Sequence, residues 1–325
     1  MKATAIAPSN IAFIKYWGKK NQVLKLPENG SIAMTLSGLA TETTVEFSDS
    51  YTLDEITINE TKEPKEGNKA IEHLDRIRII TSIHTKAKVV TRNNFPTGTG
   101  LSSSASGFAA LTMAATVAAG LKLSEKELSI IARQGSGSAC RSIPSGFIEW
   151  LGGDTSDTSY AVSLYPPEYW DIVDIVVLVS SARKDVSSSE GQKSTGSSPF
   201  FRARLAHMKQ RIDELKSALS KKDFTKLGEI SEAEALELHA IMLTSAPSLI
   251  YWTPGTLEIM KLVKVWRKEG LECYFTINTG QDVHVLVEQK NADVLRRKLQ
   301  SIKSVRDTIV NHACEGAHIT QTHLF

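Results

Sequence analysis

A turn that leads into a buried helix is predicted by Asn94-Phe95-Pro96-Thr97-Gly98-Thr99-Gly100-Leu101-Ser102-Ser103-Ser104-Ala105-Ser106-Gly107 and by the apolar run that follows it to Ala119. Pro96 fixes one backbone angle, whereas Gly98 and Gly100 permit positive φ values that most other residues avoid. A loop of this kind can direct several backbone N–H groups at one point, which suits an oligophosphate. On this stretch alone, an ordinary turn before a core helix is an equal alternative.

The context of the loop supports the phosphate interpretation. Residues 86–92 alternate like a strand, and Ser102, Ser103 and Ser104 are good helix-capping residues at the start of an alanine-rich segment. Strand, glycine-rich loop and helix in this order are typical of phosphate sites. The chain has neither a Walker A loop nor a GxGxxG motif here, so a Rossmann interpretation fails.

Length and composition indicate a globular protein of two lobes. The chain has 325 residues, of which 41% are hydrophobic and 23% charged, and its formal net charge is +2. That charge gives no case for nucleic acid as a partner. The three cysteines form no CxxC pair, so neither a disulfide framework nor a metal site is indicated. The N-terminus resembles no signal peptide and no apolar run could span a membrane, so we expect a cytoplasmic protein.

Two further stretches carry anion-binding residue types. Lys15-Tyr16-Trp17-Gly18-Lys19 is too tight for an amphipathic helix; it is either a solvated turn over Trp17 or an anion site built from the two lysines and the Tyr16 hydroxyl. In the second stretch, Gly135-Ser136-Gly137-Ser138-Ala139-Cys140-Arg141-Ser142, small residues surround a guanidinium that can hold a carboxylate or phosphate with two hydrogen bonds. A tight helix crossing with a salt-bridged arginine is the alternative.

The coarse pattern along the chain is mixed. We expect short strands at residues 3–7 and 11–16 around Pro8, an exposed hairpin within 48–66, and a doubly buried strand over 172–179 that opens the second lobe. Residues 181–198 are rich in Ser and Lys and are predicted to be a solvated loop unless a partner site is found. The remaining expected elements are helices at 69–84, 200–221, 224–242, 256–269 and 292–299, and strands at 273–277 and 283–287.

With these motifs in place, the chain resembles the mevalonate-pathway decarboxylases, the diphosphomevalonate decarboxylase family of the GHMP kinase superfamily. The resemblance covers nearly the whole chain. The glycine–serine loop marks the superfamily broadly, whereas the Lys-Tyr-Trp-Gly-Lys and Gly-Ser-Gly-Ser-Ala-Cys-Arg segments are specific to the decarboxylases. Lys184-Asp185-Val186-Ser187-Ser188 is a further matching segment.

The resemblance implies a fold and its partners. The fold would be a two-lobed α/β (α+β) GHMP kinase fold, with a ribosomal-protein-S5-like N-terminal lobe over residues 1–170 and a ferredoxin-like C-terminal lobe over 171–325. The site would lie in the cleft between them. The partners would be a small phosphorylated mevalonate, with ATP and Mg²⁺ as cofactors and no dedicated protein metal site. The protein is expected to form a homodimer. Neither nucleic acid nor a membrane is expected as a partner.

The resemblance also implies an activity: phosphorylation of the mevalonate C3 hydroxyl by ATP, followed by loss of that phosphate with CO2. It places Lys15, Arg141 and Asn278 at the catalytic positions. The implied substrate-binding residues are Tyr16, Lys19, Ser136, Ser138 and Ser188. The implied nucleotide-binding residues are Pro96, Gly98, Gly100, Leu101, Ser102, Ser103 and Ser104.

One position departs from the family. Its catalytic aspartate lies in an Asp-Ala-Gly-Pro-Asn turn, and the matching turn here is Asn278-Thr279-Gly280-Gln281-Asp282. A neutral amide cannot accept the C3 hydroxyl proton as a carboxylate does. Three explanations stay open: an engineered replacement of aspartate, an ATP-independent enzyme that takes a 3,5-bisphosphate, or a base role for Asp282, which its place on the turn disfavours. A 3-kinase that does not decarboxylate is a further alternative.

Overall fold

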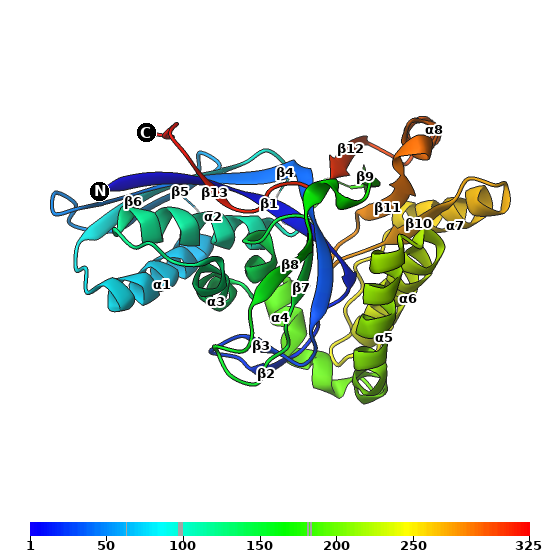
Figure 1. The fold of residues 1–325 in the computed structure, drawn as a ribbon, viewed down its shortest axis with the longest axis horizontal. Coiled ribbons are helices and arrows are strands. Elements are labelled where there is room, and N and C mark those ends of the chain that lie inside the picture. The colour runs from blue at the N-terminus through cyan, green and yellow to red at the C-terminus, as the bar shows by residue number, and fades with distance from the viewer. Residues whose placement is uncertain (63, 97–99, 181, 183) are drawn as a thin grey trace.

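The computed structural model describes residues 1–62, 64–96, 100–180, 182 and 184–325. Two β-sheets with helices packed against them make up the molecule, which confirms the predicted α/β class (Figure 1). The first sheet and its helices lie on the left of that view, and the second sheet with the long helices lies on the right.

The first sheet has seven strands in the order β13-β1-β4-β6-β5, with β7 and β8 continuing from β4. Their bounds are β1 Lys2–Ile14, β4 Ser31–Ser48, β5 Glu55–Ile58, β6 Lys86–Asn93, β7 Phe147–Trp150, β8 Ala161–Tyr165 and β13 His318–Thr320. The expectation of two short strands separated at Pro8 was wrong, because β1 is continuous. The register shifts between Pro8 and Ser9, and this irregularity lets the sheet accommodate a residue that has no N–H to donate.

Of the expected hairpin within residues 48–66, the structure has only an antiparallel bridge between Ile58 and Thr61 among the described residues. Strand β5 instead pairs in parallel with β6, with Ile56 opposite Val89. A parallel pair needs a crossover connection, and helix α1 (Pro64–Thr81) supplies it. Strand β5 has only four residues, too few for a clear alternating pattern.

Three helices cover one face of the first sheet (Figure 1): α1, α2 (Ser103–Ala118) and α3 (Glu125–Gly135). Ser124 and Glu127 form a capping box that fixes the start of α3. The 3-10 helix η1 (Gly137–Ser142) follows α3 directly and carries Arg141. Leu74, Leu111 and Ala114 pack with Val45 and Val89 of the sheet in one apolar cluster.

The second sheet has the order β10-β11-β9-β12, and every neighbouring pair in it is antiparallel. As predicted, β9 is buried on both faces along almost its whole length. The strands are β9 Ile172–Leu178, β10 Cys273–Thr276, β11 Val283–Glu288 and β12 Asp307–His312. The helices that follow β9 are α4 Ser188–Gly191, η3 Gln192–Ser197, α5 Phe201–Lys221, α6 Phe224–Thr244, α7 Pro254–Lys268 and α8 Gln289–Gln300. The small elements are η2 Pro167–Tyr169 and the hairpin of β2 Lys19–Asn21 with β3 Leu26–Pro27.

One apolar cluster joins the two halves. It includes Phe13 and Met34 of the first sheet, Val176 of the second, and Leu215 and Leu227 of α5 and α6. A shared core of this kind holds the sheets in a fixed relation, so that loops from both can meet at one site.

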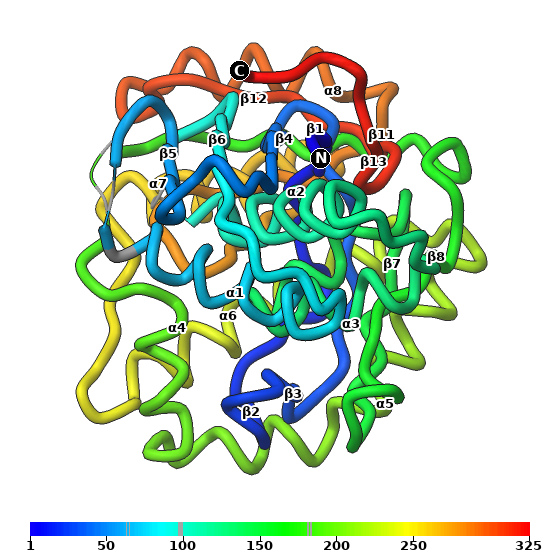
Figure 2. Tube along the Cα trace, turned by 90° about the vertical axis from the view of Figure 1, so that its left-hand side faces the viewer, coloured from blue at the N-terminus to red at the C-terminus, as the bar shows by residue number. Residues whose placement is uncertain are grey.

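The chain returns to its starting point. After β12, strand β13 pairs with β1 in the first sheet, and Lys2 Nζ donates to the Phe325 carbonyl at 3.1 Å. Both ends therefore lie together, far from the β2–β3 hairpin (Figure 2). The lobe boundary at residue 170 stays a prediction, and β13 belongs to the first sheet although it follows that boundary. Within the described part of the chain, no helix is long and apolar enough to cross a membrane.

Candidate active site

A cavity of about 540 Å³ brings together stretches that are far apart in the sequence. Its lining includes most of the residues singled out from the sequence: Lys15, Tyr16, Lys19, Gly100, Ser102, Ser103, Ser104, Ser136, Ser138, Arg141, Ser188 and Asn278. Leu101 is instead buried in the joint core, Pro96 is exposed, and Gly98 lies outside the described residues. The binding roles of these residues remain predictions.

The glycine–serine loop meets the turn that carries Asn278. Gly100 has φ +114°, and a Cβ built on it would lie 2.6 Å from Gly280 Cα, so only glycine fits. Ser102 is the N-cap of α2 in the left-handed region, with φ 59°, and its side chain makes no capping hydrogen bond. Among the described residues, the N–H groups of Ser103 and Ser104 at the start of α2 therefore have no side-chain cap at the edge of the cavity.

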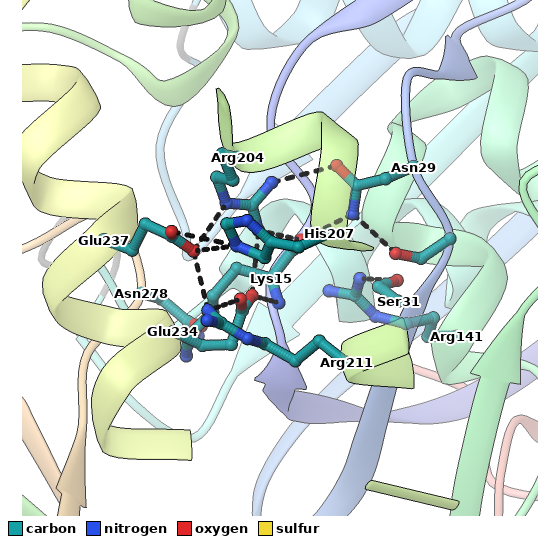
Figure 3. A network of polar contacts seen from close by, with 11 residues as sticks. Lys15, Asn29, Ser31, Arg141, Arg204, His207, Arg211, Glu234, Glu237 and Asn278 are labelled. Carbon is teal, nitrogen blue, oxygen red and sulfur yellow. Dashed lines mark hydrogen bonds and ion pairs between the residues drawn. The ribbon is translucent and has the colours of Figure 1, made fainter. Parts of the chain in front are cut away.

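Lys15 is held by its backbone from three sides. It follows the last residue of β1, and its side chain and backbone together are only 2% exposed. Its N–H donates to Glu234 Oε2 at 2.9 Å, while its carbonyl accepts from Asn29 Nδ2 at 2.9 Å and from Arg204 Nη2 at 2.8 Å (Figure 3). With the backbone fixed, the side chain extends toward Asn278, whose Oδ1 accepts from Nζ at 3.1 Å.

Burial sets the charge state of Lys15. Desolvation lowers the pKa of its ammonium to about 7, since the opposing attraction of Glu234 is weaker and the Arg141 guanidinium adds repulsion. No carboxylate contacts Nζ among the described residues; its hydrogen-bond partner there is the neutral Asn278 amide. A substantial fraction of the side chain is therefore a neutral amine at pH 7.

A buried ion-pair network supports this segment. The carboxylate of Glu234 on α6 accepts from Arg204 and from Arg211 of α5, each at 2.8 Å. Burial alone would raise the pKa of Glu234, but the charge of Arg204 and the Lys15 N–H lower it overall. Glu237 adds a contact of 2.7 Å to Arg211 (Figure 3). The sequence identified none of these residues.

Asn278 follows β10 and is fixed by three hydrogen bonds. Besides accepting from Lys15, its Nδ2 donates to Ser102 Oγ at 3.1 Å, and its carbonyl lies 2.9 Å from His239 Nε2. Burial lowers the pKa of His239 to about 3, so the imidazole is neutral and donates from Nε2. The amide therefore joins the glycine–serine loop to Lys15.

Asp282 is not placed to replace a carboxylate at position 278. It is buried, its Oδ1 accepts from the Val179 N–H at 3.1 Å, and it is outside the residues that line the cavity. The geometry thus agrees with the low rank that the sequence gives to this explanation.

Arg141 presents part of its guanidinium to the cavity. Its Nη1 donates to Ser31 Oγ at 2.6 Å (Figure 3). Its Nε donates to Asn10 Oδ1 at 3.1 Å, and the two bonds together fix the plane of the group. Neither partner is a carboxylate, and within the described residues Arg141 forms no ion pair, which argues against the salt-bridged alternative. Tyr16 lies beside it over Gly137, where a Cβ would come within 2.8 Å of the Tyr16 hydroxyl oxygen. The short side chains of this stretch therefore make room for the tyrosine.

The loop after β9 reaches the site as well. Lys184 Nζ donates to Ser188 Oγ at 2.8 Å and to the Thr279 carbonyl at 2.9 Å, and burial lowers its pKa to about 8. Ser188 and Thr279 also share a short hydroxyl contact. The expectation of a solvated loop therefore fails for this part. Lys184 was missed as a site residue, because its partner Thr279 is distant in the sequence.

Comparisons with known proteins agree with this geometry. Residues 7–161 match the family model of the diphosphomevalonate decarboxylase-like N-terminal domain, and residues 174–323 match that of the mevalonate 5-diphosphate decarboxylase C-terminal domain. A diphosphomevalonate decarboxylase of Candida albicans is 37% identical over 90% of this chain and 85% of its own length. A phosphomevalonate decarboxylase of Haloferax volcanii is 31% identical over 90% of each chain.

Solved structures are similar over the full length. A mevalonate diphosphate decarboxylase from Enterococcus faecalis superposes with a TM-score of 0.92 at 39% identity, covering 99% of both chains. A structure described as MDDEF in complex with MVAPP, AMPPCP and magnesium gives 0.93 at 40% identity, again over 99% of both. On these similarities across both halves, together with the shared two-lobed fold, the chain belongs to the diphosphomevalonate decarboxylase family.

Proposed function

We propose that the chain catalyses the ATP-dependent conversion of 5-diphosphomevalonate to isopentenyl diphosphate, phosphate and CO2. The observation that supports this most directly is the shared cavity. Arg141, a cation suited to an acidic substrate, and the Lys15 side chain face the same space as the start of α2, which suits a nucleotide phosphate. One space can therefore hold both reactants in contact.

The first step transfers the γ-phosphoryl group of ATP to the C3 hydroxyl. The N–H groups at the start of α2, which lack a Ser102 side-chain cap, and the half-buried Lys184 side chain bind the phosphate oxygens, where negative charge accumulates. Gly100 lets the backbone come close to them. The Lys15 side chain lies at the junction between this loop and Arg141, where the attacking hydroxyl has to be placed.

The second step breaks the C3–O bond and the bond to the carboxylate carbon. Departure of phosphate leaves electron deficiency at C3, and the electrons of the carboxylate C–C bond form the alkene as CO2 leaves. Arg141 holds the carboxylate in alignment through the part of its guanidinium that lines the cavity, because Asn10 and Ser31 fix the plane of the group. The neutral CO2 that forms no longer carries the charge that Arg141 attracts, so it can leave the pocket.

Mg²⁺ fits this site as an ion that enters with the nucleotide. Among the described residues, no group of three or more His, Cys, Asp or Glu side chains could hold a metal by itself. The hydroxyls of Ser103 and Ser104, which line the cavity at the start of α2, would contribute protein oxygens beside those of the phosphates. The ion would neutralise phosphate charge there.

Asn278 supports a second candidate, an ATP-independent decarboxylase of mevalonate 3,5-bisphosphate. A substrate that already carries the C3 phosphate needs no proton acceptor, so an amide at this position would be harmless. The free start of α2 favours the ATP-dependent reaction over this alternative, as it does over a 3-kinase without decarboxylation. The number of phosphates on C5 is a separate choice, and the Haloferax relative is named a phosphomevalonate decarboxylase.

One assay separates the candidates. The protein is incubated with 5-diphosphomevalonate, 5-phosphomevalonate or mevalonate 3,5-bisphosphate, each with and without Mg-ATP, and ADP and CO2 are measured. We expect equal amounts of ADP and CO2 from 5-diphosphomevalonate with Mg-ATP. CO2 that needs no ATP would favour the second candidate, and ADP without CO2 would indicate a kinase. If none of the substrates gives a product, the protein would be a binding protein and not an enzyme of this class.

The assembly and location of the protein are part of the same proposal. We expect a homodimer in the cytoplasm, with the phosphorylated mevalonate as its small-molecule partner. Sedimentation equilibrium at micromolar concentration tests the dimer, and a monomer mass over the whole range would reject it.

A further inference from the structure

Asn278 leaves the C3 hydroxyl without an obvious proton acceptor. An amide oxygen has no appreciable basicity, and a hydroxyl attacks phosphorus more readily when its proton is removed. We propose that Lys15, as a neutral amine held by Asn278, accepts the C3 hydroxyl proton during phosphoryl transfer. This inference rests on the proposed ATP-dependent function.

The position of the amine fits that role. Lys15 Nζ lies 3.1 Å from Asn278 Oδ1, and the Asn278 amide is in turn fixed by Ser102, at the start of the phosphate-binding loop. Nζ is therefore linked through Asn278 to the start of α2, where the γ-phosphate is expected, and Arg141 lines the same cavity close enough for its charge to act on Lys15. A hydroxyl that attacks the γ-phosphate has to pass within reach of this nitrogen.

The hydrogen bonding of Nζ suits an amine better than an ammonium. An ammonium has three donors, yet within the described residues Nζ finds one acceptor, the Asn278 amide oxygen. A neutral amine can donate one N–H to that oxygen and keep its lone pair for the substrate. A carboxylate at position 278 would instead favour the ammonium, so the amide and the amine are a matched pair.

The surrounding charges support a neutral amine. Burial lowers the pKa of Lys15 to about 7, Arg141 and Arg204 lower it further, and Glu234 and Asp174 oppose them. Glu234 is shared by two arginines, and Asp174 lies 3.0 Å from His284 Nδ1.

Two further groups face Lys15 or its partner. Lys184 reaches the neighbouring Thr279 and adds another positive charge on that side. His239 contacts the Asn278 carbonyl and is neutral, since burial lowers its pKa to about 3. Apart from the shared Glu234 and the His284-bound Asp174, the groups named here add no negative charge that would restore the ammonium.

The step is balanced. The O–H bond at C3 breaks and its proton joins the Lys15 lone pair, while the oxygen forms a bond to the γ-phosphorus and the bond to the ADP oxygen breaks. Lys15 is then an ammonium beside the new C3 phosphate, where its charge favours departure of that phosphate in the next step. It returns the proton to solvent after product release.

Other acceptors along the cavity are poorer. The carboxylates among its described lining residues are Glu66 and Asp185, and both are exposed. Neither contacts Lys15 or Asn278 in the structure. Asp185 nevertheless lies next to Lys184, so its replacement is the natural control.

The test measures ADP formation in a single turnover with 5-diphosphomevalonate and Mg-ATP from pH 5.5 to 9. For the wild type we expect a rate that rises about tenfold per pH unit below a midpoint near pH 7 and levels off above it. Lys15→Arg keeps the charge but cannot become neutral, so the rate should fall at least about 100-fold at pH 8. Asp185→Asn should keep the wild-type pH midpoint.

Rescue separates a base from a structural cation. Asn278→Asp restores a carboxylate acceptor, so the double variant Lys15→Arg/Asn278→Asp should recover at least about tenfold and lose the midpoint near pH 7. Lys15→Ala should be rescued by ethylamine in proportion to its unprotonated fraction. Circular dichroism and 5-diphosphomevalonate binding confirm that each variant is folded.

Each contrary result is decisive. A Lys15→Arg variant with more than half the wild-type rate, or a wild-type rate that is constant from pH 5.5 to 9, would overturn the base role while leaving the ATP-dependent function intact. A loss of the midpoint in Asp185→Asn would assign the role to that carboxylate. Absence of ADP from wild type and Asn278→Asp alike, with CO2 released from mevalonate 3,5-bisphosphate, would reject the proposed function and the inference with it.

Discussion

Gly100 packs against Gly280 so closely that Gly100 cannot carry a side chain: a Cβ on Gly100 would lie 2.6 Å from Gly280 Cα. This contact joins the loop before α2 to the turn after β10, and thereby brings a stretch of the first half of the chain against one of the second. The hydrogen bond from Asn278 Nδ2 to Ser102 Oγ lies beside it. The cavity depends on this junction.

Gly100→Ala should therefore weaken nucleotide binding as well as stability. The φ of +114° is strained for alanine and the methyl group would collide with Gly280, so we expect a loss of about 1–3 kcal/mol in the free energy of unfolding. Binding of a non-hydrolysable ATP analogue, measured by calorimetry, should weaken at least about tenfold.

Gly270→Ala is the matched control, since Gly270 has φ +95° with nothing near its Cβ position. It should lose stability from the backbone alone and bind the analogue as the wild type does. Equal nucleotide affinity in the two variants would contradict a role for the Gly100–Gly280 contact.

Arg141→Lys should reduce turnover without unfolding the protein. A lysine can carry the charge but cannot donate at once to Asn10, to Ser31 and into the cavity, so the carboxylate of the substrate would lose its alignment. We expect kcat for CO2 release to fall at least about 100-fold, with a melting temperature within a few degrees of the wild type.

Ser31→Ala is the control variant for Arg141→Lys, because it changes a partner of the guanidinium and not the guanidinium itself. It removes one of the two contacts that orient the guanidinium and leaves the charge in place, so a loss of about tenfold is expected. An Arg141→Lys variant as active as Ser31→Ala would show that charge alone is sufficient.

The parts of the site that could be predicted are those whose residue types are unusual in themselves. Gly100 needs a positive φ, and Arg141 stands among small residues; such features are visible without knowledge of the fold. Strand β9, which follows the predicted lobe boundary at residue 170, was also predicted, because a long β-branched run is typical of a buried strand.

The remainder depends on contacts that no local pattern contains. The sequence pattern of the helix that carries Glu234 indicates only an amphipathic helix. Glu234 is completely buried there, where its carboxylate accepts from Arg204 and Arg211 of the preceding helix. Lys184 is half-buried, and its contact with the turn at Thr279 joins residues that are far apart in the sequence. The formation of strand β5 likewise depends on its pairing with β6, which is distant in the sequence.

Glu234→Ala should be strongly destabilising, because it leaves the buried Arg204 without its carboxylate. We expect a loss of about 3–5 kcal/mol in the free energy of unfolding, measured by urea denaturation. Activity should fall too, since Glu234 also fixes the Lys15 backbone. Lys290→Met removes an exposed ion pair with Glu288 and should change neither stability nor activity measurably. A Glu234→Ala protein as stable as this control would contradict the network.

The pH dependence of stability should report His239. Its pKa is lowered from 6.5 to about 3 in the folded protein, so between these values the unfolded chain binds a proton that the folded one does not. Stability should therefore fall as pH drops below 6.5, by up to about 1.4 kcal/mol per pH unit for this residue. His239→Gln keeps a donor for the Asn278 carbonyl but cannot titrate, and should show a correspondingly smaller slope in urea denaturation from pH 4.5 to 6.5.

His73→Gln is the control that separates the effect of losing a buried histidine on the pH dependence of stability from an effect on the active site. His73 is also buried with its pKa lowered to about 3, but it contacts Thr112 in the helical layer and lies outside the cavity lining. The same reduction in slope is expected there, with activity retained, whereas His239→Gln should alter activity because Asn278 shifts. If removing His239 left the slope at the wild-type value, the pKa of His239 in the folded protein would lie near the 6.5 of the unfolded chain, and burial would then not hold its imidazole neutral below that pH.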